Sequence, residues 1–328
     1  MNRVTAPLHI IKLTRRWGGL ATDALLDPAC QYYQTSAIEG FIGYRVERRC
    51  AIVYGDPVCA LENQVKLAQS FHLFCSDKYK NVIYVTASAS FANSVCKESC
   101  KVMIEYGESI ALNPQNNPKE RTGTNGSLIR RKTRQARDYG VTVTEYTSND
   151  SHTEEQIEQV GVEWLNSRKG PQIHISNVHL FENRFGKRWF IAKKKDEIVG
   201  TVVLNQLESK EGWHLNHLMT NKNAPNGTPE LLVISVLEIL KDENCSFVSC
   251  GAASTKELGE VKGLSKISSW VARRMFKFAT KIFYLKGHKM FWGKFHPITA
   301  PSYLVFQKAR IGAWELAALM DALNVSLT

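Results

Sequence analysis

Clustered arginine and lysine side chains are the residues of this sequence whose type and spacing most clearly indicate chemistry. The stretch 261–294 holds nine Lys or Arg and no Asp or Glu, in a chain of formal net charge +11. Within it, Arg273, Lys277 and Lys281 follow at four-residue steps, which places them on one helix face. Such a face attracts anions through salt-screened fields. Nucleic-acid phosphate, an anionic membrane surface and plain solvent are the alternatives for what it contacts.

A second basic stretch lies near the middle of the chain. Residues 127–140 are predicted to form a helix that ends at Gly140. Two basic helices in one chain favour an extended anionic partner over a merely solvated surface. The positive side chains of this stretch are Arg130, Arg131, Lys132, Arg134 and Arg137.

Several short motifs that hold cofactors or nucleophiles are absent from the sequence. The Q/R-x-x-G-x-G/A turn, whose amides would bind the pyrophosphate of acetyl-CoA at a helix amino terminus, has no copy; residues 137–142 (RDYGVT) fail at the last position. The nucleophile elbow, the P-loop and the G-x-G-x-x-G fingerprint are also missing. Acetyl-CoA, serine hydrolysis, P-loop phosphoryl transfer and dinucleotide redox chemistry are therefore disfavoured.

Length and composition predict an ordinary globular protein. At 328 residues and 44% hydrophobic content, two domains are expected. Eight cysteines without a C-x-x-C pair or a matching His/Cys spacing favour reduced thiols and no metal site. The sequence shows no signal-peptide core and no window long and apolar enough to span a bilayer. We therefore expect a cytoplasmic protein, free or peripheral on the inner face of a membrane, with its oligomeric state open.

Two parts of the chain repeat one order of elements. Each predicts a strand, a charged turn and a strand, then further strands and helices in alternation. The first comprises strands within 34–59, a helix over 62–78, a strand over 81–87 and a helix over 90–106; the second comprises a hairpin over 188–204, a strand over 213–219, a helix over 228–241 and a strand over 245–250. This order predicts an α/β (α+β) fold of two acetyltransferase-like modules, each β-β-α-β-α, around mixed sheets.

The expected domain organisation follows from these elements. It comprises an amino-terminal extension at 1–33, a first acetyltransferase-like module at 34–126, a basic connecting helix and a linker helix at 127–170, and a second module with the basic amphipathic helix at 171–328. In that last helix we expect the aromatic side chains to lie in the core rather than in lipid. They are Trp270, Phe276, Phe278, Phe283 and Tyr284.

Six short phrases occur along the chain in an order that matches one known family. They are Gly55–Val58, Gly107-Glu108, Arg134–Gly140, Trp164-Leu165, His217–Thr220 with Ala224–Thr228, and Lys294–Pro297 with Tyr303-Leu304. Over roughly residues 34–304, the sequence resembles the carboxy-terminal catalytic domain of the phosphatidylglycerol lysyltransferase (multiple peptide resistance factor) family. The resemblance implies a tandem acetyltransferase-like (dual GNAT) fold. It also implies transfer of an amino acid to a lipid hydroxyl, with aminoacyl-tRNA as co-substrate in place of CoA and no cofactor.

The sequence departs from the bacterial members of that family in two places. Those members usually carry a D-L-M-R phrase where this chain has His217-Leu-Met-Thr220. They also follow a many-helix membrane flippase, which this sequence does not contain. Freestanding relatives, including fungal enzymes that place an amino acid on a sterol hydroxyl, share the layout seen here. Phosphatidylglycerol and a sterol are therefore both candidate acceptors.

The site candidates come from the matching phrases, from residues near them and from the two basic helices. Because an aminoacyl ester is already activated, a site must orient it against the hydroxyl, take up the hydroxyl proton and stabilise an oxyanion. His217 is the predicted general base and Lys294 the predicted cation for phosphate or oxyanion. The substrate-binding candidates are Asp56, Glu108, Glu230, His296 and Tyr303; the tRNA- or anion-binding candidates are Arg130, Arg131, Arg134, Arg273, Lys277 and Lys281.

Structural roles are the alternatives for these residues. His217 is equally well explained as a strand-end histidine. For Lys294 a surface cation is the less favoured alternative, while His296 and Tyr303 are expected to be structural. Asp56 is expected to fix its own Gly-Asp-Pro turn. Two other functions stay open: an acetyl-CoA-dependent N-acetyltransferase, and a non-catalytic protein that binds RNA or a membrane surface.

Overall fold

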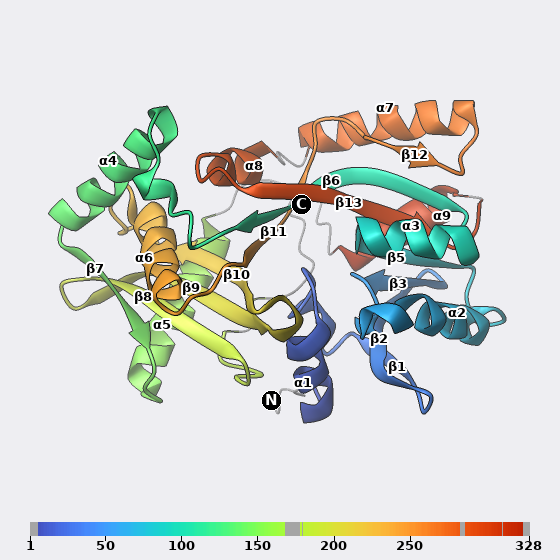
Figure 1. Ribbon diagram of the computed structural model, residues 1–328, viewed down its shortest axis with the longest axis horizontal. Coiled ribbons are helices and arrows are strands. Elements are labelled where there is room, and N and C mark those ends of the chain that lie inside the picture. Colours follow the sequence, from blue (N-terminus) through green and yellow to red (C-terminus); the bar gives the residue numbers. More distant parts are fainter. Residues whose placement is uncertain (1–5, 168–177, 179, 283–285, 310, 324–328) are drawn as a thin grey trace.

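The structure is a computed structural model, and it is described for residues 6–167, 178, 180–282, 286–309 and 311–323. Figure 1 shows one long twisted sheet with helices on both faces. The first set of elements comprises α1 (Leu8–Trp17), β1 (Gln31–Thr35), β2 (Ile38–Glu47), β3 (Cys50–Tyr54), β4 (Val58–Cys59), α2 (Gln64–Cys75), β5 (Asn81–Ser88), α3 (Ala89–Glu98) and β6 (Val102–Leu112). None of the helices in the described ranges is long and apolar enough to cross a bilayer.

A second set of elements follows the basic segment. It comprises α4 (Thr124–Asp138), β7 (Val141–Tyr146), α5 (Ser151–Asn166), β8 (Lys187–Lys194), β9 (Glu197–Leu207), β10 (Gly212–Thr220), α6 (Thr228–Asp242) and β11 (Val248–Ser254). The chain then adds β12 (Val261–Lys262), α7 (Lys266–Ile282), α8 (Lys286–Gly293), β13 (Ile298–Phe306) and α9 (Ala313–Ala322).

The predicted tandem acetyltransferase-like α/β fold is confirmed. In each set, a three-stranded antiparallel meander leads through one helix into a parallel strand: β3 and β5 are joined across α2, and β10 and β11 across α6. A helix is the usual crossover between parallel neighbours because the return path must cover a sheet face. The helix predicted over 90–106 was too long, since α3 ends at Glu98 and Val102 already pairs with β13.

The last strands of the two sets are neighbours in the centre of the sheet. Its order is β1-β2-β3-β5-β13-β6-β11-β10-β9-β8-β7, with β12 on β6 and β4 on β2. Thus β6 lies beside β11 of the second set, and β13 inserts between β5 and β6. The middle of the sheet is therefore built from strands that are far apart in sequence.

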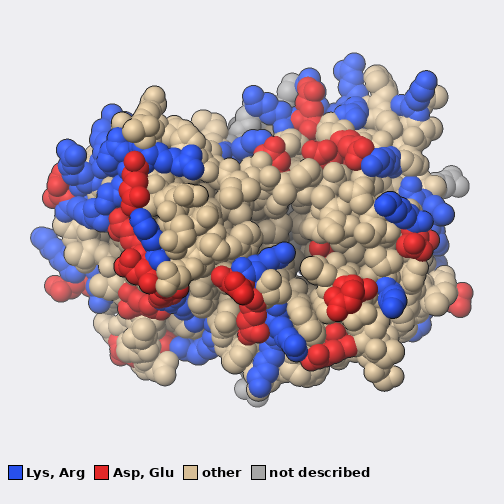
Figure 2. Space-filling model, viewed as in Figure 1, with Lys and Arg blue, Asp and Glu red and all other residues tan. Residues whose placement is uncertain are grey.

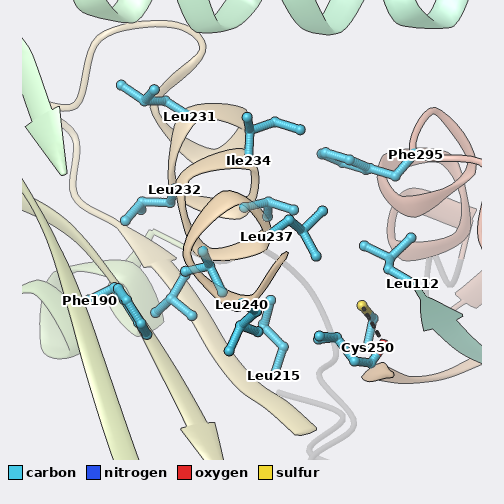
Figure 3. Close-up of a cluster of buried hydrophobic side chains, with 14 of the residues drawn as sticks. Leu112, Phe190, Leu215, Leu231, Leu232, Ile234, Leu237, Leu240, Cys250 and Phe295 are labelled. Carbon is cyan, nitrogen blue, oxygen red and sulfur yellow. Dashed lines mark hydrogen bonds between the residues drawn. The ribbon is translucent and has the colours of Figure 1, made fainter. Parts of the chain in front are cut away.

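Strands β10 and β11 diverge along their length. They pair only at Trp213 with Val248 and at His214 with Ser249. Beyond this point β10 continues along β9, whereas β11 continues along β6. Side chains of α6, among them Ile234 and Leu237, point toward Phe295 and toward β11, on one side of the space between the diverging strands (Figure 3). Packed side chains thus cover the α6 face of this divergence.

Burial of histidine in this fold predicts a stability that falls in mild acid. Burial lowers the pKa of His72 to about 4, and its Nε2 lies 2.9 Å from the hydroxyl of Tyr84. An unfolded histidine titrates near pH 6.5, so the unfolded state takes up the proton first and stability is lost as the pH falls from about 6.5 through about 4. His72→Gln is expected to remove about 1–2 kcal/mol of the stability difference between pH 7 and pH 5. Urea unfolding at both pH values measures this.

The exposed His152 supplies the control for that experiment. His152→Gln should leave the difference between the two pH values unchanged. An equal difference in the wild type and in His72→Gln would show that the buried imidazole does not control acid stability.

Candidate functional site

The segment that follows α8 places a lysine against the first turn of α6. Lys294 Nζ donates to Glu230 Oε1 at 2.5 Å, and the two side chains are only 14% and 9% exposed. The ammonium also lies 3.9 Å from the ring centroid of Phe291. An ion pair that is largely desolvated acts on a bound ligand more strongly than a surface pair. Among the described ion pairs of predicted site residues, this pair is the most buried.

Helix α6 begins against α4 because of one glycine. Gly227 has φ +97°, and a Cβ there would lie 2.1 Å from the carbonyl oxygen of Lys132. Only glycine accepts both the left-handed backbone and so close an approach. Lys132 Nζ in turn donates to Asn226 Oδ1 at 2.6 Å. The Lys294 and Glu230 pair is therefore tied to the basic helix.

The basic residues of α4 divide into a structural one and exposed ones. The guanidinium of Arg130 donates to the carbonyl oxygens of Lys119 and Arg121, both at 2.8 Å, and so holds the segment before the helix. Arg131 and Arg134 are exposed and border an open hollow of about 600 Å³. Figure 2 shows Lys and Arg gathered where Figure 1 places α4. Anion binding by α4 would therefore use Arg131 and Arg134 more readily than Arg130.

Two further predicted residues lie around α8. Glu108 on β6 accepts from Lys289 of α8 at 2.9 Å. His296 is exposed, has φ +53°, and its Nε2 lies 3.4 Å from Nδ2 of Asn125 in the first turn of α4. The structure thus gathers Glu108, Glu230, Lys294 and His296 around α8 and its continuation.

His217 lies on the other face of the sheet from that group. It pairs with Val203 of β9, whose side chain packs into the cluster formed with α5, while α6 packs on the opposite face. Directly opposed residues of antiparallel strands share a face. His217 and Lys294, the two residues predicted to be catalytic, therefore lie on opposite faces of the sheet. The pairing of β10 with β11 ends at His214, so the two strands already diverge where β10 carries His217.

A buried carboxylate beside His217 was not foreseen from the sequence. Asp23 accepts from Arg15 at 3.2 Å, from Lys187 at 3.0 Å and from Asn216 at 2.8 Å. Burial favours its neutral form, yet the charges of Lys187, Arg15 and His217 together lower its pKa to about 2. Asp23 is thus an anion at neutral pH, and an anion stabilises a protonated imidazole beside it. The only hint in sequence was an acidic residue directly before the apolar run Ala24-Leu25-Leu26.

Asp56 and Tyr303 have structural surroundings. The expectation that Asp56 fixes its own turn was wrong, since its Oδ1 accepts from the backbone N–H of Ser88 at 2.9 Å, at the amino end of α3. Burial raises the pKa of this carboxyl. Tyr303 is 5% exposed within the core that α2 and α3 cover, and burial raises its pKa as well. Neither residue is brought to α8 by a described contact.

Helix α7 differs from the expectation in its aromatic residues. Trp270 and Phe278 are exposed, not buried, although Phe276 does pack on the core; Phe283 and Tyr284 lie outside the described residues. Of the predicted anion binders, Arg273 donates to the carbonyl oxygens of Leu258 and Gly259. Lys277 pairs with Glu257 at 3.1 Å. Both cations are therefore already engaged within the chain, and the side chain of Lys281 lies outside the described part.

Comparison with known proteins gives a family and a shared fold. The profile of the family described as "Phosphatidylglycerol lysyltransferase, C-terminal" matches residues 19–306. The C-terminal domain of a protein described as a lysylphosphatidylglycerol synthetase from Agrobacterium fabrum is similar in structure, with TM-score 0.77, 18% identity, and 97% of this chain and 96% of that chain covered. L-PGS from Bacillus licheniformis gives TM-score 0.76, 16% identity and 97% coverage of both chains. Among curated proteins, none matches the sequence.

Proposed function

Because this chain belongs to the phosphatidylglycerol lysyltransferase C-terminal family, we propose that it transfers an amino acid from aminoacyl-tRNA to a hydroxyl of a membrane lipid. The observation that carries the proposal is the largely buried pair of Lys294 and Glu230 beside the Arg-rich helix α4. One side chain suits an oxyanion or a phosphate, the other suits an ammonium, and an aminoacyl-tRNA ester offers all three groups.

The proposed reaction exchanges one ester for another, so it requires little chemistry from the protein itself. The lipid hydroxyl oxygen attacks the ester carbonyl carbon and loses its proton to a base. The tetrahedral oxyanion then collapses, the bond to the ribose oxygen breaks, and that oxygen takes up a proton to leave deacylated tRNA. Lys294 is proposed to donate to the oxyanion, and Glu230 to orient Lys294 and attract the α-ammonium of the amino acid. Positioning and electrostatics of this kind supply much of the rate enhancement in acyl transfer.

We assign the base role to His217, with Asp23 as its positioning partner. A carboxylate beside an imidazole stabilises the imidazolium formed during proton uptake. Asp23 is ionised and interacts electrostatically with His217. On this assignment the lipid hydroxyl reaches His217 from the α5 face, and the ester reaches Lys294 from the α6 face. The reacting atoms would meet where β10 and β11 diverge.

The exposed arginines of α4 are proposed to bind tRNA phosphates. Each Lys or Arg contact to phosphate adds close to one unit to the dependence of log affinity on log salt. The double variant Arg131→Glu/Arg134→Glu is therefore expected to lower that slope by about two and to weaken binding of different tRNAs similarly. Filter binding at several salt concentrations measures it.

A charge-matched control lies on the far end of the molecule. Lys97 and Lys101 are exposed at and after the end of α3, and Lys97→Glu/Lys101→Glu changes the net charge by the same amount. Equal slopes for the two double variants would mean that α4 gives no more than a general positive field.

The reaction itself is tested by thin-layer chromatography. Purified protein is incubated with a total lipid extract and with tRNA charged with labelled amino acids, with and without RNase. A new labelled lipid that disappears with RNase supports the proposal and gives the amino acid and the acceptor. If charged tRNA survives and no lipid is labelled, the proposal fails, and protection against heat by acetyl-CoA becomes the next measurement.

A further inference from the structure

Helix α7 presents its large apolar side chains to solvent. The exposed fractions are 78% for Ile267, 60% for Trp270, 51% for Met275 and 67% for Phe278, and Val271 is 41% exposed. Single exposed hydrophobic residues are ordinary, but five on one helix form an extended apolar surface. We call this set, Ile267, Trp270, Val271, Met275 and Phe278, the α7 stripe.

The side of α7 that faces the protein carries mostly small residues. Ala272, Phe276 and Ala279 are half-buried and Thr280 is buried. Small side chains let the helix lie close to the body of the protein, where Phe276 reaches the core of the first set. In most surface helices the larger apolar residues point inward. Here the arrangement is reversed, so packing within the described part of the chain does not account for the α7 stripe.

Positive side chains line one edge of the stripe. At about 100° per residue, Ile267, Val271, Phe278 and Met275 fall within a sector of about 80°, and Lys266 and Arg274 lie beside it on the same edge as Trp270. Arg274 stacks on Trp270, with its guanidinium carbon 5.2 Å from the ring centroid. Figure 1 shows α7 along the outer margin, and Figure 2 shows Lys and Arg projecting there. Apolar and cationic sectors side by side are the composition of helices that lie in a membrane interface.

We propose that α7 lies in the headgroup region of an anionic bilayer, with the α7 stripe inserted between lipids and its cationic edge against the headgroups. An RNA surface would neutralise the cations but would leave five apolar side chains against phosphate and water. A bilayer satisfies both sectors at once. The inference rests on the proposed function, since a transferase that acts on a membrane lipid must reach the bilayer surface.

Vesicle flotation without tRNA tests the proposal. The wild-type protein is expected to float with phosphatidylcholine vesicles that contain phosphatidylglycerol, and less with phosphatidylcholine alone. Ile267→Ser/Phe278→Ser is expected to weaken binding to the anionic vesicles by about tenfold or more, because each side chain loses its apolar burial. Lys266→Glu/Arg274→Glu should weaken binding mainly at low salt.

A matched control separates this effect from general loss of surface hydrophobicity. Leu61 and Leu73 are 72% and 77% exposed and lie next to or on α2, so Leu61→Ser/Leu73→Ser removes a similar apolar area elsewhere. This variant should float like the wild type. Equal loss of flotation in both double variants would overturn the assignment to α7. Unchanged flotation of the α7 variant would overturn it as well. The same holds if the α7 substitutions abolish tRNA binding instead of flotation, or if they convert a dimer to a monomer.

Failure of this inference can be distinguished from failure of the proposed function. In detergent micelles that contain the lipid extract, the α7 variant should transfer amino acid at the wild-type rate, because lipid reaches the site without a bilayer. A wild-type protein that floats but transfers nothing in micelles would refute the reaction and leave the membrane surface standing. One that transfers in micelles but does not float would refute the role of α7.

Discussion

Replacing Lys294 by methionine is expected to lower kcat/KM for aminoacyl transfer by about 10²- to 10³-fold, the usual effect of removing a preorganised donor to an oxyanion. Methionine keeps most of the side-chain volume against Phe291, which lies beneath the ammonium. The loss should appear mainly in kcat, because the charge on the oxyanion exists only after attack. Single-turnover transfer from charged tRNA measures it.

Lys289 provides the control for this variant. It lies on α8 and also pairs with a carboxylate, Glu108, but is 46% exposed against 14% for Lys294. Lys289→Met is expected to change the rate by less than about tenfold. If Lys294→Met has normal kcat, or if Glu230→Gln/Lys294→Met regains the wild-type rate, the pair is structural and the catalytic assignment is wrong.

Removal of the Asp23 carboxylate is expected to give the largest loss of stability. Arg15 is fully buried and Lys187 nearly so, and both donate to Asp23. In Asp23→Ala the two cations would stay buried without their shared anion, which typically costs about 3–5 kcal/mol. Urea unfolding near neutral pH measures the change. Asp321→Ala removes the exposed partner of Arg48 and is expected to cost about 0–1 kcal/mol.

The pH dependence of the wild type gives a second measure of this carboxylate. The folded pKa of Asp23 is about 2, below its usual unfolded value near 3.9. Its contribution of about 2–3 kcal/mol is therefore fully present above about pH 4 and is lost as the pH falls through 2. This acid-induced loss should be smaller in Asp23→Ala. A loss below pH 4 as large as that of the wild type would assign it to other groups.

The elements that repeat along the chain could be predicted from sequence because local pattern determines them. The apolar run of Asn81–Ser88 and the helix Thr228–Asp242 lie almost where alternation, breaks and helical spacing placed them. The error at Val102 has a cause outside the segment. Val102, Met103 and Ile104 suit a helix as well as a strand, and pairing with β13, some 200 residues later, selects the strand.

Part of the candidate site could also be predicted from sequence. The Arg-rich helix and the phrase from Lys294 to Pro297 are conspicuous by composition, and the structure brings Lys294, Glu230 and His296 near the amino ends of α6 and α4. The roles of these residues and the domain boundaries stay predictions. Sequence gave no indication that Lys294 and His217 would approach from opposite faces, because the face of a strand residue depends on register and on the bulge between Leu215 and His217.

The amino-acid sequence by itself determined the order of most elements that the two modules repeat, the position of the positive charge and the family. These depend on neighbours within a few residues and on local composition. The tertiary structure decided which charged and apolar side chains are exposed and which are engaged: Arg273 is held by its own chain, the apolar α7 stripe is exposed, and Asp23 interacts with Arg15, Lys187 and His217. These properties arise from contacts between residues far apart in the chain, and only the folded sheet fixes such contacts.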